Sequence, residues 1–197
     1  MLLILLAVIG CNQRPPGTPS IEVCFSPKGG CTDAIVRELG DARSKVLVQA
    51  YSFTSAPIAT ALVDAARRGV KVQVILDKSQ ETEKYSSADF LIHSGIPTRI
   101  DPVHEIAHNK IMIIDDQTVI TGSFNFTRAA EEHNAENLLV IHDPELADQY
   151  TANWYRHADH SVSYRRMEAS EPSGRSRAPA AGHPSHHSSK PSLEFRF

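Results

Sequence analysis

The sequence predicts an α/β sandwich in which helices flank a mixed central β-sheet. Short apolar runs rich in β-branched residues alternate with segments of helical periodicity, and glycine or proline separates many of them. Hydrophobic residues make up 41% of the 197 residues, which is enough for one domain with a real core. We expect this domain to span residues 21–166.

The first half of the domain alternates strand and helix. Strands are predicted at residues 21–25, 45–51 and 70–76, and helices at 32–42, 55–68 and 83–93. The second helix has clear ends, because Pro57 lies in its first turn and Gly69 follows its last residue. Gly95 is expected to close the third helix in the same way.

The second half contains a predicted hairpin and a long final helix. Residues 110–115 form a short apolar run that suits a buried strand, residues 115–117 a polar turn, and residues 118–121 a returning strand. A short helix at 127–132 and a strand at 137–141 follow. Pro144 then begins the last helix, which carries Leu146, Tyr150 and Trp154.

Six residues of the hairpin region carry the chemistry: His108, Lys110, Asp115, Gly122, Ser123 and Asn125. An imidazole can attack phosphorus, and ammonium and amide groups can hold the non-bridging oxygens of a phosphodiester. His108 and Lys110 project to the same face of a strand, and the hairpin returns Ser123 and Asn125 beside them. No cluster of metal-ligating residues lies near this motif at ligand spacing, so we expect neither a metal nor a cofactor.

Asp115 is expected to act differently from the rest of the motif. It lies five positions beyond Lys110, so it does not share the face of that residue in a regular strand. We interpret it as an anchor that fixes the hairpin or a neighbouring cation. The alternative is a simple turn residue, since Asp favours turns.

The spacing of these residues resembles the HKD motif of the phospholipase D superfamily. Residues 21–166 look like the compact bacterial endonucleases of that superfamily, which carry one motif per chain; the matching stretches are 51–54, 67–72, 93–97, 122–127 and 134–137. The resemblance implies the family's sandwich fold and a catalytic set of His108, Lys110, Asp115 and Glu136, with Glu136 hydrogen-bonded to the imidazole. Lys110, Ser123 and Asn125 would bind the substrate phosphate.

A single motif per chain predicts a homodimer. Displacement at phosphorus is in line, so one imidazole cannot both attack and protonate the leaving oxygen on the opposite side. The second histidine must then come from another subunit, with the site on a two-fold axis. One His108 would form a phosphohistidine while its symmetry mate acts as general acid and then as general base.

Three functions compete on the sequence alone. The first is a metal-independent phosphodiesterase acting on nucleic acid, as the resemblance implies; the second is a phospholipase D acting on phosphatidyl lipids such as phosphatidylcholine. The third is a non-catalytic envelope protein. Before Arg165 there are 14 Lys and Arg against 20 Asp and Glu, which argues against a broad basic surface for nucleic acid. No long hydrophobic loop that would bind lipid is evident in the sequence.

The amino terminus predicts export. Residues 1–10 form an apolar stretch of the length of a signal h-region, and Gly10-Cys11 resembles the lipobox of bacterial lipoproteins. We therefore expect a periplasmic or envelope lipoprotein, anchored to the membrane through lipidated Cys11, or else a simply cleaved leader; residues 1–11 are the leader and 12–20 a linker. In an oxidising compartment Cys24 and Cys31 would form a disulfide, the alternative being two buried thiols.

Several residues are expected to play no part in the site. Residues 167–197 are interpreted as a disordered tail, in which His183, His186 and His187 are solvated rather than metal-bound. Tyr51 is assigned to core packing and His104 to loop surface, although either could reach the pocket. The remaining histidines are expected to be structural and to form no constellation: His93, His133, His142, His157 and His160.

Overall fold

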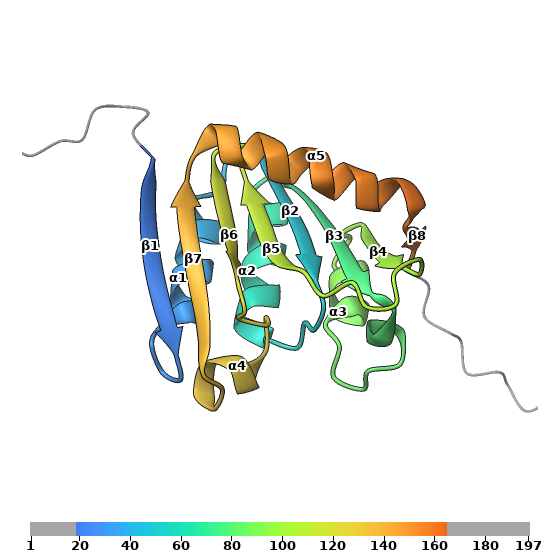
Figure 1. Cartoon of the computed structure of the whole chain (residues 1–197). Helices are drawn as coiled ribbons and strands as arrows, with labels where there is room; N and C mark the ends of the chain where they lie inside the picture. Colours follow the sequence, from blue (N-terminus) through green and yellow to red (C-terminus); the bar gives the residue numbers. More distant parts are fainter. Residues whose placement is uncertain (1–18, 165–197) are drawn as a thin grey trace, which may run out of the picture. The chain divides into compact units, whose positions relative to one another are not determined.

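The computed structural model describes residues 19–164, which form one eight-stranded sheet with helices on both faces (Figure 1). The strands follow the order β1-β7-β6-β5-β2-β3-β4-β8. Their bounds are β1 Ser20–Ser26, β2 Lys45–Ala50, β3 Lys71–Asp77, β4 Thr98–Asp101, β5 Lys110–Ile114, β6 Thr118–Gly122, β7 Glu136–His142 and β8 Val162–Ser163. Only the β2–β3 and β3–β4 pairs are parallel, so the predicted mixed sheet is confirmed.

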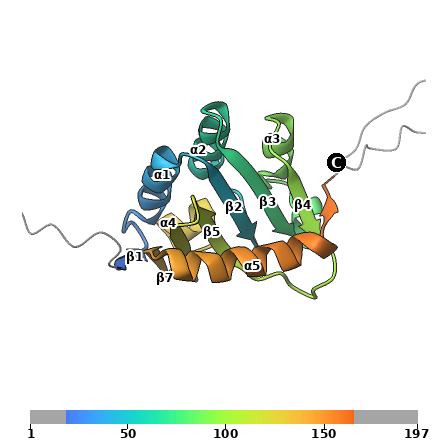
Figure 2. The same cartoon turned by 90° about the horizontal axis from the view of Figure 1, so that it is seen from above.

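The helices lie in two layers. They are α1 Cys31–Asp41, α2 Ala56–Arg67, α3 Ala88–His93, α4 Arg128–Glu132 and α5 Pro144–His160, with a 3₁₀ helix, η1, at Lys78–Glu81. Figure 2 shows α1, α2 and α3 on one face of the sheet and α5 running across the other. Asp143 begins α5 by accepting hydrogen bonds from the backbone N–H groups of Glu145 and Leu146, and Pro144 occupies the first turn.

Each face of the sheet has its own core, because successive strand residues point to opposite sides. Val46 and Val48 of β2 join the larger core beneath α1, α2 and α3, whereas Leu47 joins the smaller core beneath α5. Trp154 anchors α5 to this smaller core, with its ring nitrogen donating a 2.9 Å hydrogen bond to the carbonyl of Val48. The two cores hold the central strands rigidly and so fix the edge at which those strands end.

The predicted hairpin is present. Strands β5 and β6 pair in antiparallel register, and the turn between them places Asp115 and Asp116 at φ 56° and 57°. Two consecutive residues with positive φ form the tight turn whose twist matches a β-hairpin, and Asp tolerates that conformation better than most residues. The polar turn in the sequence therefore has a direct conformational reason.

Three local predictions differ from the structure. The helix expected at 83–93 is shorter, since residues 82–87 form an irregular loop between η1 and α3. Gln80 holds the start of this segment, because its side-chain oxygen accepts a 3.1 Å hydrogen bond from the backbone of Phe53. Strands β4 and β8 were not predicted; they have four and two residues, too few for a periodic signal.

Three further predicted segments fall partly or wholly outside the described residues. The leader with Cys11, most of the linker and the histidine-containing tail all lie there, so they stay predictions. Within residues 19–164, no helix combines the length and the apolar character needed to cross a bilayer.

Candidate active site

The residues of the motif gather where four strands end or begin, at the lower edge of the sheet in Figure 1. Because β2 and β5 are antiparallel, the end of β2 lies beside the start of β5, and Ala50 pairs with Lys110. The end of β6 lies beside the start of β7 for the same reason, with Gly122 opposite Leu138. This arrangement carries His108, Lys110, Ser123, Asn125 and Glu136 to one edge.

His108 lies exposed on an aromatic platform. The imidazole packs against the ring of Tyr51, with 4.6 Å between ring centroids and 57° between the ring planes. The backbone N–H of Tyr51 donates a 2.8 Å hydrogen bond to the carbonyl of Asn109, which fixes the loop next to His108. Tyr51 had been assigned to core packing, and the structure corrects this assignment: its ring is only partly buried and contacts the site.

Lys110 is the cation beneath the imidazole. Its side chain is buried, its Nζ donates a 2.6 Å hydrogen bond to the carbonyl of His108, and it lies 5.0 Å from the centroid of the Tyr51 ring. Burial lowers the pKa of Lys110 from its ordinary value, while the charge of Glu136 acts in the opposite direction. A buried ammonium group with these few partners is suited to an anionic ligand, which would replace some of its lost hydration.

Glu136 begins β7 close enough to Lys110 to act on its charge. Its carboxylate accepts a 3.2 Å hydrogen bond from the side-chain amide of Asn134. The hydrogen bond from Glu136 to His108, which the resemblance implied, stays a prediction.

Ser123 is held in place by β7. Its hydroxyl donates to the side-chain oxygen of Asn137 at 3.2 Å and accepts from the backbone N–H of Asn137 at 3.1 Å. The backbone N–H groups of Ser123 and Phe124 both donate to the Asn137 carbonyl, at 3.1 and 3.2 Å. Gly122 permits this close approach, because its φ is 148° and a Cβ there would collide with that carbonyl.

Asn125 carries a polar group without a partner. Among the described residues, its side-chain oxygen is buried and makes no hydrogen bond. A buried amide oxygen left without a partner costs about 1–3 kcal/mol, so such groups are retained where a ligand or water completes them. The unpartnered atom is an acceptor, so it calls for a hydrogen-bond donor, and binding of the substrate phosphate through the side-chain NH₂ group of Asn125 stays a prediction.

Asp115 lies at the other end of β5, away from the imidazole. Its carboxylate accepts hydrogen bonds of 2.8–2.9 Å from the backbone N–H groups of Arg43, Ser44 and Lys45 and from the hydroxyl of Ser44. Burial would raise the pKa of Asp115, but these hydrogen bonds outweigh it and the pKa is lowered. Asp115 thus ties the hairpin turn to the start of β2 and does not join the other motif residues.

The two cysteines are free thiols in the structure. Cys31 is fully buried, and burial, followed by the neighbouring Cys24, raises the pKa of the Cys31 thiol to about 12. A thiol in this state is a poor nucleophile. The expected Cys24–Cys31 disulfide is not formed in the structure, and the oxidised form stays a prediction.

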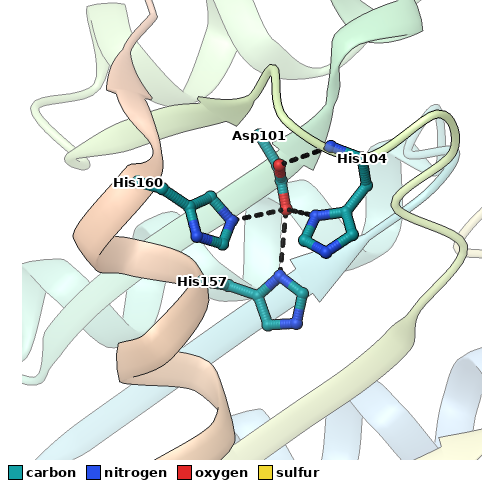
Figure 3. Close-up of side chains that lie close together, drawn as sticks. All are labelled: Asp101, His104, His157 and His160. Atoms are coloured by element: carbon teal, nitrogen blue, oxygen red, sulfur yellow. Dashed lines mark hydrogen bonds and ion pairs between the residues drawn. The ribbon is translucent and has the colours of Figure 1, made fainter.

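His157 and His160, which were expected to form no constellation, meet His104 of the loop around one carboxylate, so that expectation was wrong for these two residues (Figure 3). His104, His157 and His160 all point a ring nitrogen at Oδ2 of Asp101, at 2.9, 2.9 and 3.2 Å. Burial would raise the pKa of Asp101, but the hydrogen bonds from His157, His160, the Val103 N–H and His104 lower it far below its usual range. This carboxylate is therefore ionised.

A family model and several relatives match the described domain. Residues 35–157 match the family described as "Cardiolipin synthase, PLD-like domain". A protein named phospholipase D from Rickettsia typhi is 46% identical over 146 residues, which cover 74% of this chain and 72% of that protein. A mitochondrial cardiolipin hydrolase from Mus musculus is 31% identical over 150 residues, 76% of this chain and 68% of that protein.

A solved structure has the same fold and is similar to this chain in sequence. Nuc from Salmonella typhimurium, titled a phospholipase D family member, superposes with a TM-score of 0.73 and 38% identity, covering 75% of this chain and 99% of that one. The family model, the relatives and this structure agree with the motif geometry. The chain belongs to the phospholipase D superfamily, as a compact, single-motif hydrolase with a PLD-like domain.

Proposed function

We propose that the protein hydrolyses phosphodiesters through a covalent phosphohistidine on His108, without a metal ion at phosphorus. The proposal rests on one observation, the pairing of the exposed imidazole of His108 with the buried ammonium group of Lys110. This ammonium group donates a hydrogen bond to the backbone carbonyl of His108. This pairing puts a nucleophile and a fixed positive charge in one place.

The reaction has two balanced steps. A ring nitrogen of His108 attacks phosphorus while the bond to the leaving oxygen breaks, and a second imidazole donates a proton to that oxygen. The second imidazole, now neutral, takes a proton from water, and the water oxygen displaces His108 from phosphorus. Lys110, Asn125 and Ser123 stabilise the charge on the non-bridging oxygens, with a few kcal/mol per donor.

The second imidazole comes from a second copy of the chain in this proposal. Edge strand β1 offers a surface for such a contact, since Ile21, Val23 and Phe25 lie on one of its faces with exposed fractions of 66%, 49% and 65%. This strand pairs with β7, so that Ser26 lies opposite Glu136 of the site. An apolar stripe that leads to the catalytic edge supports a dimer whose interface includes that edge.

Phospholipid is the substrate class that the described surface favours. The loop that leads into His108 carries two exposed apolar side chains, Val103 at 64% and Ile106 at 54%. The sequence does not indicate these exposed side chains; an apolar lipid-binding surface is what would distinguish a lipid hydrolase from a nuclease. The relatives named phospholipase D and cardiolipin hydrolase support the same substrate class.

Nucleic acid is the second candidate. The resemblance to compact bacterial endonucleases and the similarity to Nuc support it. The excess of acidic residues before Arg165 weakens it, because binding to a polyanion draws on a basic surface.

A substrate panel tests both parts of the proposal. The full chain is assayed in EDTA against phosphatidylcholine vesicles, plasmid DNA and the soluble diester bis(p-nitrophenyl) phosphate, with His108→Ala as the inactive reference. We expect vesicle hydrolysis to exceed DNA cleavage and all of it to survive EDTA. Activity that is lost in EDTA and restored by a divalent ion, even when His157 and His160 are replaced by alanine, would contradict chemistry without a metal at phosphorus. Cleavage of DNA alone would make nucleic acid the substrate.

The apolar loop has its own matched test. Val103→Ser combined with Ile106→Ser should lower vesicle hydrolysis about a hundredfold or more while leaving hydrolysis of the soluble diester unaffected, because two apolar anchors are worth roughly 1.5–3 kcal/mol each and about 1.4 kcal/mol is tenfold. Val162→Ser, at an apolar side chain of similar exposure (51%) on β8, serves as the control. Equal losses on both substrates would instead indicate a damaged site.

A further inference from the structure

Four metal-ligating side chains converge outside the catalytic motif. Asp101 ends β4, His104 follows it in the loop, and His157 and His160 occupy the last turn of α5 (Figure 3). One ligand atom from each of the four lies within 4.8 Å of all the others. The set combines two pairs with the same spacing, Asp-x-x-His and His-x-x-His, contributed by segments far apart in the sequence.

The carboxylate of Asp101 cannot accept hydrogen bonds from all the donors that this cluster directs at it. The three ring nitrogens face one oxygen, Oδ2, which has two lone pairs. The other oxygen, Oδ1, already accepts from the backbone N–H groups of Val103 at 3.1 Å and His104 at 3.4 Å. A carboxylate with no exposed surface, surrounded by three imidazoles, thus has more donors directed at one oxygen than that oxygen can accept.

Three of the six ligand–ligand distances are close to those of a tetrahedral metal site, and all four ligand atoms lie within 4.8 Å of one another. Bonds of 2.0–2.1 Å to imidazole nitrogen and carboxylate oxygen place neighbouring ligand atoms about 3.3 Å apart. The three nitrogens lie 2.9–3.2 Å from the Asp101 oxygen, so small outward rotations of the rings would open the space for an ion. Three neutral imidazoles and one carboxylate are a donor set that suits Zn²⁺ and its neighbours in the first transition row.

We propose that Asp101, His104, His157 and His160 bind one divalent transition-metal ion of the Zn²⁺ class. All four positions come from the protein, so the ion has no open position for substrate and acts structurally. It joins the last turn of α5 to the loop that carries His108, four residues beyond His104. It does not take part in the chemistry at phosphorus.

The surroundings fix the backbone of the two segments that carry the ligands. Arg99 donates from one guanidinium nitrogen to the carbonyls of Ala158 and Ser161, at 3.1 and 2.8 Å, which fixes the end of α5 against β4. The Ser161 hydroxyl donates a 2.7 Å hydrogen bond to the carbonyl of His157. The loop is held a second time where the Ala107 N–H donates to Asp77 at 2.7 Å. These contacts hold the end of α5 and the loop after β4 in place without the ion.

Metal uptake by the full chain tests the proposal. The protein is prepared without an affinity tag and with His183, His186 and His187 replaced by serine, because the tail histidines could bind metal themselves. It is stripped with EDTA, desalted and titrated with Co²⁺, then with Zn²⁺. We expect one equivalent of Co²⁺ to bind with the intense visible bands of four-coordinate cobalt, and Zn²⁺ to displace it and raise the thermal midpoint.

Matched variants assign the site. In the same background, His157→Ala with His160→Ala should weaken uptake at least a hundredfold, whereas His133→Ala, at an exposed histidine outside the cluster, should leave it unchanged. Asp101→Asn keeps the size of the side chain, so a loss of uptake in this variant is not the result of a fold defect. Circular dichroism monitors folding of every variant. No uptake by the parent protein, six-coordinate cobalt bands, or equal uptake by the ligand variants would overturn the proposal.

Discussion

Tyr51 contributes to the site through its ring. The ring supports the imidazole of His108 on one side and lies 5.0 Å from the ammonium of Lys110. A cation above an aromatic ring is stabilised by about 0.5–2 kcal/mol, and a ring packed against the nucleophile limits its rotation. Tyr51 is therefore a positioning residue, since no contact between its hydroxyl and the other motif residues is needed for either effect.

Substitution of Tyr51 tests this role. Tyr51→Phe should keep kcat within about twofold because the ring remains, whereas Tyr51→Ala should lower kcat about 10–100-fold by misplacing His108. Both variants are measured with a soluble diester, so that substrate affinity and turnover separate. A loss as large in Tyr51→Phe as in Tyr51→Ala would assign the effect to the hydroxyl and contradict the prediction.

The residues of the site differ in how far the sequence predicts them. His108, Lys110, Ser123 and Asn125 could be assigned because one hairpin carries them all, so local spacing determines which side chains meet. The Asp101 cluster could not, because its two halves come from different elements and meet only when α5 crosses the sheet. The signal present in the sequence was the three-residue spacing that the pairs Asp101/His104 and His157/His160 share.

At the scale of the element, the hairpin turn depends on Asp115. Four hydrogen bonds converge on one partly buried carboxylate, and the residue itself adopts a left-handed conformation at φ 56°. Asp115→Asn keeps the tolerance for positive φ but removes the charge and presents an NH₂ group to backbone donors. We expect it to lower the free energy of unfolding by about 1–3 kcal/mol, with kcat within twofold of the parent.

Asp115 also makes the free energy of unfolding depend on pH. Its pKa in the folded protein lies below the ordinary value, so ionised Asp115 stabilises the fold above the unfolded pKa of about 4. This contribution is lost as the pH falls through the folded pKa. Denaturant unfolding between pH 7 and pH 3 should therefore show a smaller acid-induced loss of stability in Asp115→Asn than in the parent. Identical pH profiles of stability in the two proteins would show that Asp115 does not cause the acid-induced loss.

Some secondary-structure elements follow from local sequence, whereas others depend on tertiary contacts. The buried strands and helices α2 and α5 were predicted because periodicity, Pro and Gly act within one segment. Strand β8 exists only because Val162 pairs with Ile100, and the loop at 82–87 follows tertiary contacts such as that of Gln80. Neither feature has a signal in its own residues.

For the whole molecule, the shared site is the sharpest prediction. Mixed dimers of one parent and one His108→Ala subunit, isolated with two different tags, should be nearly inactive if both imidazoles act on one phosphodiester. Dimers with two complete sites would keep about half the activity. His133→Ala mixed dimers, with an exposed histidine outside the site, provide the matched control. Half-activity, or an active monomer in sedimentation, would require a different general acid.

Export is the other prediction for the whole molecule. We propose that the mature protein lacks its apolar leader, either with Cys11 as a lipidated terminus or after simple cleavage, and contains a Cys24–Cys31 disulfide. The described thiols suit this proposal, since Cys24 and Cys31 are close enough for each to influence the ionisation of the other. Mass spectrometry of envelope fractions checks it; an intact Met1 and two free thiols would contradict it.

The position of Asp115 has one consequence for how variants combine. Lys110 and Asp115 are separated by the length of β5, roughly 16 Å at the rise of an extended strand. Changes at sites this far apart, with no shared partner, add to within about 0.3–0.5 kcal/mol. A double-mutant cycle of Tyr51→Ala and Asp115→Asn should therefore give no coupling energy. The free energy of unfolding can be altered at one end of a single strand while turnover is altered, independently, at the other.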